Sequence, residues 1–85
     1  MKEEVSGRDL IGKSVIGKSG KAIGVVTDVM FNPETTEIIY LVIGKITNFG
    51  KELNFKRVGD NFLIPFEAVV SIGDFVIIDE NQVIS

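Results

Sequence analysis

Glycine and proline interrupt this sequence about every ten residues, a spacing typical of chains built from short strands. The nine glycines and two prolines separate segments rich in Val, Ile and Phe, which is the usual composition of β-strands. No segment has the length and the 3.6-residue period of a long helix. The spacing therefore predicts an all-β fold.

The apolar segments predict about six strands, at residues 13–16, 22–32, 37–44, 62–65, 69–72 and 75–78. Pro33 stands where a turn between the second and third strands needs a preset φ. Val26 breaks the alternation of the second strand, which suggests a bulge near Thr27. Residues 45–60 fit either a long loop or an irregular hairpin, and only residues 66–69 fit a helical turn.

Such short strands bury too little surface as a flat sheet, so we expect them to curl into a small closed or partly open antiparallel β-barrel. Antiparallel pairing is expected because the sequence has no room for crossover helices. At 85 residues the chain fits one domain, residues 1–85.

Composition excludes most catalytic chemistry. The chain has no Cys and no His, so thiolate or histidine metal sites and histidine-dependent triads are not available. We therefore expect no enzyme activity, cofactor or metal. The polar first residues lack a signal-peptide core, and no apolar run approaches the roughly 20 residues that span a bilayer, so we expect a cytoplasmic protein without membrane insertion.

Charge is unevenly distributed along the chain. Residues 13–57 contain seven basic and four acidic side chains, whereas residues from 58 onward contain five acidic side chains and no basic ones. This asymmetry fits either an ordinary solvated surface or a polarised docking surface. The net charge of −3 disfavours nucleic acid as the partner, because phosphate binding depends on basic side chains.

Residues 12–19, Gly-Lys-Ser-Val-Ile-Gly-Lys-Ser, match the phosphate-loop pattern G-x-x-x-x-G-K-[ST]. A functional phosphate loop must be followed by a helix whose first amides face the phosphates. Here Val15 and Ile16 indicate a strand inside the motif, and glycines and β-branched residues follow it. We therefore interpret the match as a hairpin turn and expect no nucleotide binding.

Two surfaces are candidates for partner binding. The segment 45–60 combines apolar and basic side chains on a loop, where binding residues are common, and its predicted partner-binding residues are Phe49, Lys51, Leu53, Phe55, Lys56 and Arg57. The alternative is that the apolar ones cover one end of the barrel. The third strand is apolar on both faces: Ile39, Leu41 and Ile43 share one parity, and Ile38, Tyr40 and Val42 share the other. A small barrel buries only one face, so the other is either covered by the chain's own loop or tail or forms a homodimer contact, for which Ile38, Tyr40 and Val42 are the candidate face.

The order of these segments resembles the PRC-barrel family, known from the cytoplasmic part of the photosynthetic reaction centre H subunit and from the C-terminal domain of ribosome maturation factors. The resemblance is carried by residues 9–15, 20–24, 28–35, 38–42, 64–69 and 73–79. Thr36 stands where many members have Gly.

The resemblance implies a six-stranded barrel without a general active site. Family members mostly mediate protein interactions, and stand-alone archaeal members associate with cell-division machinery. We therefore expect a small archaeal adaptor that binds other proteins. The alternative is an RNA- or ribosome-associated factor, because Lys45, Lys51, Lys56 and Arg57 lie near Phe49 and Phe55, a combination that suits single strands.

Overall fold

The computed structural model describes residues 7–82. Seven strands form one sheet in the order β4-β5-β3-β2-β1-β7-β6. They are β1 (Ser14–Gly17), β2 (Ala22–Phe31), β3 (Ile38–Gly44), β4 (Lys56–Val58), β5 (Asn61–Pro65), β6 (Val69–Ile72) and β7 (Phe75–Ile78). The all-β prediction is confirmed, and six of the strands match the predicted ones to within one residue at each end.

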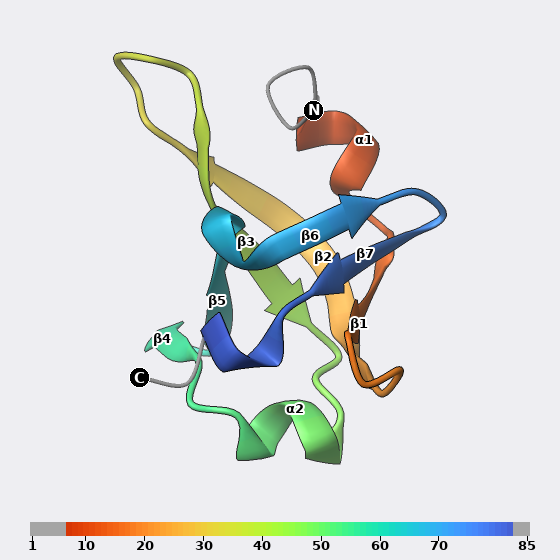
Figure 1. Ribbon diagram of the computed structural model, residues 1–85. Coiled ribbons are helices and arrows are strands. Elements are labelled where there is room, and N and C mark those ends of the chain that lie inside the picture. The colour runs from red at the N-terminus through yellow and green to blue at the C-terminus, as the bar shows by residue number, and fades with distance from the viewer. Residues whose placement is uncertain (1–6, 83–85) are drawn as a thin grey trace.

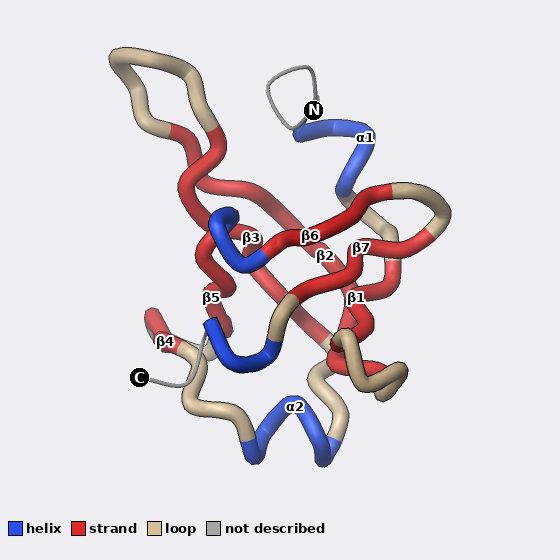
Figure 2. Tube along the Cα trace, viewed as in Figure 1, coloured by secondary structure: helices blue, strands red, loops and turns tan. Residues whose placement is uncertain are grey.

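The sheet curls around a single buried cluster, and β4 and β6 lie at its two ends (Figures 1 and 2). It is a partly open barrel, because the strand order pairs neither end strand with the other. The most deeply buried side chains come from almost every part of the sheet and from residues before β1: Leu10, Val15, Ile23, Val26, Leu41, Ile43, Ile64, Val76 and Ile78.

One pairing corrects the antiparallel prediction. β1 and β7 are parallel, with Val15 opposite Val76 and Ile16 opposite Ile77. Parallel neighbours need a long connection between them, and the prediction assumed that this connection had to be a helix. Here the remaining strands of the sheet provide it, because the chain curls until β7 returns to β1.

The register of β2 against β3 explains which faces are buried. A bulge between Val26 and Asp28 confirms the irregularity predicted near Thr27, and a second one follows between Met30 and Phe31. Leu41 and Ile43 point into the core, whereas Ile39 is 42% exposed. Ile39 lies at the second bulge, without a partner in β2, which accounts for its exposure; that it shares a face with Leu41 and Ile43 stays a prediction.

Short helical elements lie around the sheet. They are α1 (Gly7–Leu10), α2 (Asn48–Glu52) and the 3-10 turns η2 (Phe66–Ala68) and η3 (Glu80–Gln82). In Figure 1, α1 lies at the upper end of the molecule and α2 at the lower end. The helical turn expected within residues 66–69 is η2. Among residues 7–82, no helix is long and apolar enough to cross a membrane.

Candidate protein-interaction site

The segment between β3 and β5 is an ordered unit tied to the start of β2. Thr47 precedes α2, and its side-chain oxygen Oγ1 accepts a hydrogen bond from the amide of Gly50 at 2.9 Å. The same hydroxyl donates to the carbonyl of Ala22 at 2.7 Å, and the Thr47 amide donates to the carbonyl of Ile23 at 2.9 Å. These bonds cap the helix and hold it against the sheet.

Close approach of the backbones requires glycine in α2. A Cβ added at Gly50 would lie 2.8 Å from the carbonyl oxygen of Ile23 and 2.8 Å from Cγ1 of Ile46. Because the first contact is with backbone, a larger residue would push α2 away from β2. The position of α2 therefore depends on this one small residue as well as on the Thr47 cap.

The three apolar residues predicted as partner contacts have a structural role. Leu53 and Phe55 are only 9% and 8% exposed and belong to the buried core, and Phe49 is partly buried against it. The ammonium of Lys21 lies 5.1 Å from the centre of the Phe49 ring. This arrangement agrees with the alternative that these residues cover one end of the barrel.

The three predicted basic residues, Lys51, Lys56 and Arg57, are all exposed. Lys56 and Arg57 lie on β4, where they pair with Leu63 and Phe62 of β5. The Arg57 guanidinium lies 4.7 Å from the centre of the Phe62 ring, and the Lys56 ammonium lies 5.5 Å from the centre of the Tyr40 ring. Each cation thus rests on an aromatic ring, a contact that favours an ordered side chain.

Lys51 and Arg57, but not Lys56, lie in the lining of a hollow of about 510 Å³, which we call the basic hollow. It is lined by Lys51, Leu53, Asn54, Phe55, Arg57 and Phe62. Phe55 and Phe62 meet edge to face, with ring centres 6.4 Å apart. The lining contains two cations and no carboxylate, so the hollow combines an apolar base with a positive rim.

Sequence reasoning missed Phe62 as part of this site. Val58 and Asn61 are paired in the β4–β5 hairpin, so the turn consists of Gly59 and Asp60 alone, and Gly59 has φ +63°. A two-residue turn beginning with Gly is a recognised hairpin pattern. Interpreting Gly59-Asp60 in that way would have predicted β4 and placed Arg57 beside Phe62.

The predicted homodimer face is covered by the chain itself at one of its three residues. Val42 is 8% exposed and lies opposite Leu63, which is also buried. Ile38 packs against the core cluster but is partly exposed, and Tyr40 is partly exposed beneath Lys56. A homodimer stays a prediction, with Ile38 and Tyr40 left to support it.

The phosphate-loop match has the geometry of a hairpin. Residues 14–17 form β1, and the turn that follows leads directly into β2. The turn binds the carboxylate of Glu80, which lies in η3. Glu80 Oε1 accepts a hydrogen bond from the Lys18 amide at 3.0 Å, and Oε2 accepts from the Ser19 hydroxyl at 2.6 Å and from the Ser19 amide at 3.3 Å. The Ser19 hydroxyl is the main cause that lowers the pKa of Glu80 below 4.5, with the backbone hydrogen bonds adding to it.

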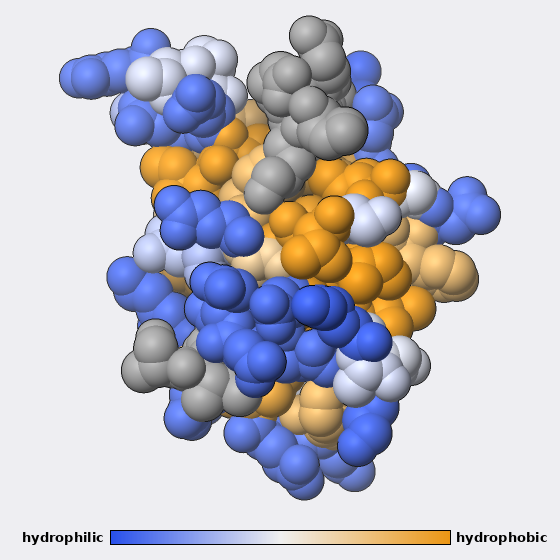
Figure 3. Space-filling view, in the orientation of Figure 1, coloured by the Kyte–Doolittle hydropathy of each residue, from blue (hydrophilic) through white to orange (hydrophobic). Residues whose placement is uncertain are grey.

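Apolar side chains also reach the surface over β6 and β7, where Figure 3 shows a continuous hydrophobic area. Val70 is 53% and Phe75 is 49% exposed. Among residues 7–82, no group of three or more acidic side chains is placed to hold a metal ion.

Comparison with known proteins agrees with this architecture. The PRC-barrel domain family matches residues 2–83. An uncharacterised protein from the archaeon Methanocaldococcus jannaschii is 31% identical over 80 residues, which cover 94% of this chain and 86% of that protein. The curled seven-stranded sheet and both comparisons lead to the same conclusion: the chain belongs to the PRC-barrel domain family.

Proposed function

We propose that the protein is a small non-catalytic adaptor that binds an acidic, partly apolar segment of a partner protein in the basic hollow. The observation that carries the proposal is the lining itself. Lys51 and Arg57 stand over a base formed by Leu53, Phe55 and Phe62, and no carboxylate lines the hollow. A positive rim around an apolar base matches a segment in which acidic and apolar side chains alternate.

The position of the hollow on the fold supports this role. Leu53 and Phe55 in its base are core residues and Arg57 rests on the Phe62 ring, so binding would find these three side chains already held. Pre-ordered aromatic and arginine side chains contribute strongly to protein interfaces. The absence of Cys and His from the sequence supports binding rather than catalysis.

RNA binding is less well supported by the same residues. Stacking of bases needs open ring faces, but Arg57 lies over Phe62 and Phe55 is almost fully buried. The net charge of −3 also opposes attraction of a polyanion. The basic side chains therefore fit carboxylates of a protein better than a nucleic-acid strand.

The proposed setting is the archaeal cytoplasm. The family match and the similarity to an archaeal protein support an archaeal origin, and the resemblance to stand-alone archaeal members extends the proposal to partners in the cell-division machinery. Family members mediate protein interactions in general, so the partner's identity has to come from experiment.

The test is affinity capture from an extract of the source organism with tagged wild type and with Lys51→Glu/Arg57→Glu. The double variant should lose a partner that the wild type retains. A control with the same change of charge, Lys18→Glu/Lys45→Glu, alters exposed lysines outside the hollow and should retain it. Equal loss in both variants, or no loss in either, would contradict the assignment.

A salt titration separates the RNA alternative. Binding to bulk RNA that weakens steeply with salt, and that is lost in Lys51→Glu/Arg57→Glu, would identify a nucleic-acid site instead. We expect no saturable binding to RNA at physiological salt.

A further inference from the structure

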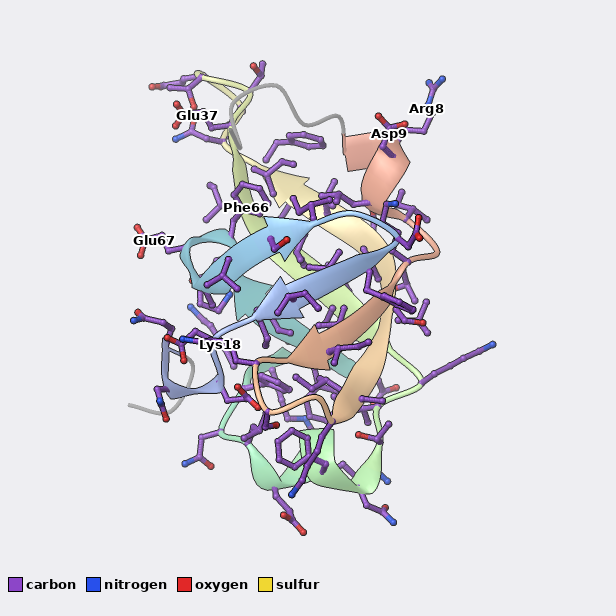
Figure 4. All side chains as sticks on the ribbon, turned by 45° about the vertical axis from the view of Figure 1, so that its right-hand side comes forward. Arg8, Asp9, Lys18, Glu37, Phe66 and Glu67 are labelled. Atoms are coloured by element: carbon purple, nitrogen blue, oxygen red, sulfur yellow. The ribbon has the colours of Figure 1, made fainter. Side chains whose placement is uncertain are left out.

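A second groove, with the opposite charge, lies between the β2–β3 hairpin and η2. It has a volume of about 400 Å³ and is lined by Asn32, Glu37, Ile38, Ile39, Tyr40, Pro65, Phe66 and Glu67. Figure 4 shows Glu37 and Glu67 on the same side of the molecule, with Phe66 between their levels. We call this feature the acidic groove.

The groove exists because β5 is shorter than β3. Pairing between the two strands runs from Ile43 opposite Phe62 to Tyr40 opposite Pro65. Beyond Pro65 the chain turns into η2, while β3 extends further back to Ile38. Beyond Pro65, therefore, η2 rather than a strand faces the start of β3, and η2 forms the opposite wall of the groove.

The chemistry of the groove is apolar at the base and negative at its sides. Ile39 is 42% exposed, and Tyr40, Pro65 and Phe66 are each partly exposed. Glu37 and Glu67 are both exposed, and the lining contains no Lys or Arg. Two acidic residues in the lining of one groove, without a cation in that lining, form a site complementary to a positive side chain.

We propose that the acidic groove binds an extended segment of a partner protein that carries Lys or Arg next to apolar residues. The segment would lie in the groove between the start of β3 and η2 and would be held by contacts with the side chains that line it. Since side chains alternate along an extended chain, apolar ones would contact Ile39 and Phe66 while a cation reaches Glu37 or Glu67. This site is separate from the basic hollow and goes beyond the function proposed above.

The probe is a phage-displayed library of random ten-residue peptides selected on immobilised wild-type protein. We expect enrichment of peptides that carry Lys or Arg beside apolar residues. In solution, a selected peptide should bind Glu37→Lys/Glu67→Lys at least about tenfold more weakly, because both attractive charges become repulsive. Amide signals of residues 37–40 and 66–67 should shift on titration of the wild type.

Two further variants keep the result interpretable. Glu52→Lys/Asp74→Lys makes the same change of net charge at exposed residues outside the groove, with Glu52 on α2 at the other end of the molecule, and should retain binding within about threefold, as expected for distant charges screened by salt. Glu37→Gln/Glu67→Gln removes the charges without repulsion and should weaken binding by a smaller factor than the lysine variant.

Three outcomes would overturn the proposal. They are selection of no peptide or of acidic ones, equal loss of binding in the control variant, and a concentration-dependent dimer of the wild type that Glu37→Lys/Glu67→Lys dissociates. The last would assign the groove to a second copy of the chain. None of these results depends on whether Lys51 and Arg57 bind a partner, so failure here is distinguishable from failure of the basic hollow.

Discussion

Thr36, in the β2–β3 hairpin, has φ 61°, a conformation that costs an L-residue about 1–2 kcal/mol relative to glycine. Its amide donates to the carbonyl of Asn32 at 2.7 Å, which holds the turn. Thr36 therefore adopts a backbone conformation that glycine would adopt without this cost.

We predict that Thr36→Gly stabilises the protein. Relief of the positive φ should exceed the extra flexibility of the unfolded chain, for a net gain of about 0.5–1 kcal/mol in the free energy of unfolding. Urea denaturation measures it. The matched control is Glu34→Gly in the same exposed turn, which is not among the residues with positive φ and should lower stability. Destabilisation by Thr36→Gly would contradict the account.

Glu80 should make stability depend on pH. Its pKa is lowered in the folded protein, first by the Ser19 hydroxyl. Because the folded-state pKa is lowered, the ionised Glu80 stabilises the folded protein fully above the unfolded-state pKa. This stabilisation is lost as pH falls through the folded-state pKa. The melting temperature should therefore fall below about pH 4.5, and Glu80→Gln and Ser19→Ala should each reduce that dependence.

At the scale of the element, the segment from α2 to β4 contains both aromatic residues that support the core and exposed basic residues available for contact. Phe55→Ala removes a ring that is 8% exposed and packs against Phe62, so we predict a loss of about 3–5 kcal/mol in the free energy of unfolding. Arg57→Ala, on the exposed strand next to it, should change stability by less than about 1 kcal/mol. Chemical denaturation of the two variants decides whether the segment's aromatic residues are core. Equal stability of Phe55→Ala and wild type would show that Phe55 is not part of the core.

The β1–β2 turn leads to a prediction about nucleotides. The amides of Lys18 and Ser19 already donate to Glu80, and β2 follows where a phosphate loop needs a helix. Calorimetry with magnesium and ATP or GTP at millimolar concentration should therefore show no binding. A saturable signal abolished by Lys18→Ala would show that the turn is a phosphate site after all.

At the scale of the whole molecule, the parallel β1–β7 pair joins the two ends of the described chain. Val76 is fully buried opposite Val15, whereas Val70 on the edge strand β6 is 53% exposed. We predict that Val76→Ser costs about 2–4 kcal/mol, because it leaves a cavity and buries a hydroxyl. Val70→Ser, the same substitution at an exposed site, should change stability by about 0.5 kcal/mol or less. Similar losses in both would show that β7 does not close the core.

Sequence patterns were sufficient to predict the strand content, six of the seven strands, the bulge near Thr27 and the family. These features depend on local composition and on the period of side chains along one strand, which neighbouring residues already contain. Sequence also indicated that the phosphate-loop match was a turn, since the helix that the motif requires was missing.

Other features became visible only in the folded chain: which side chains the strands bury, and which charged side chains share a groove. The parallel β1–β7 pair, the burial of Leu53 and Phe55, and the exposure of Ile39 all depend on contacts between distant residues or on a bulge that shifts the register. Glu37 and Glu67 likewise share a groove only because β5 ends at Pro65 while β3 continues. Pairing and curvature of the sheet create these neighbours, and no local pattern contains them.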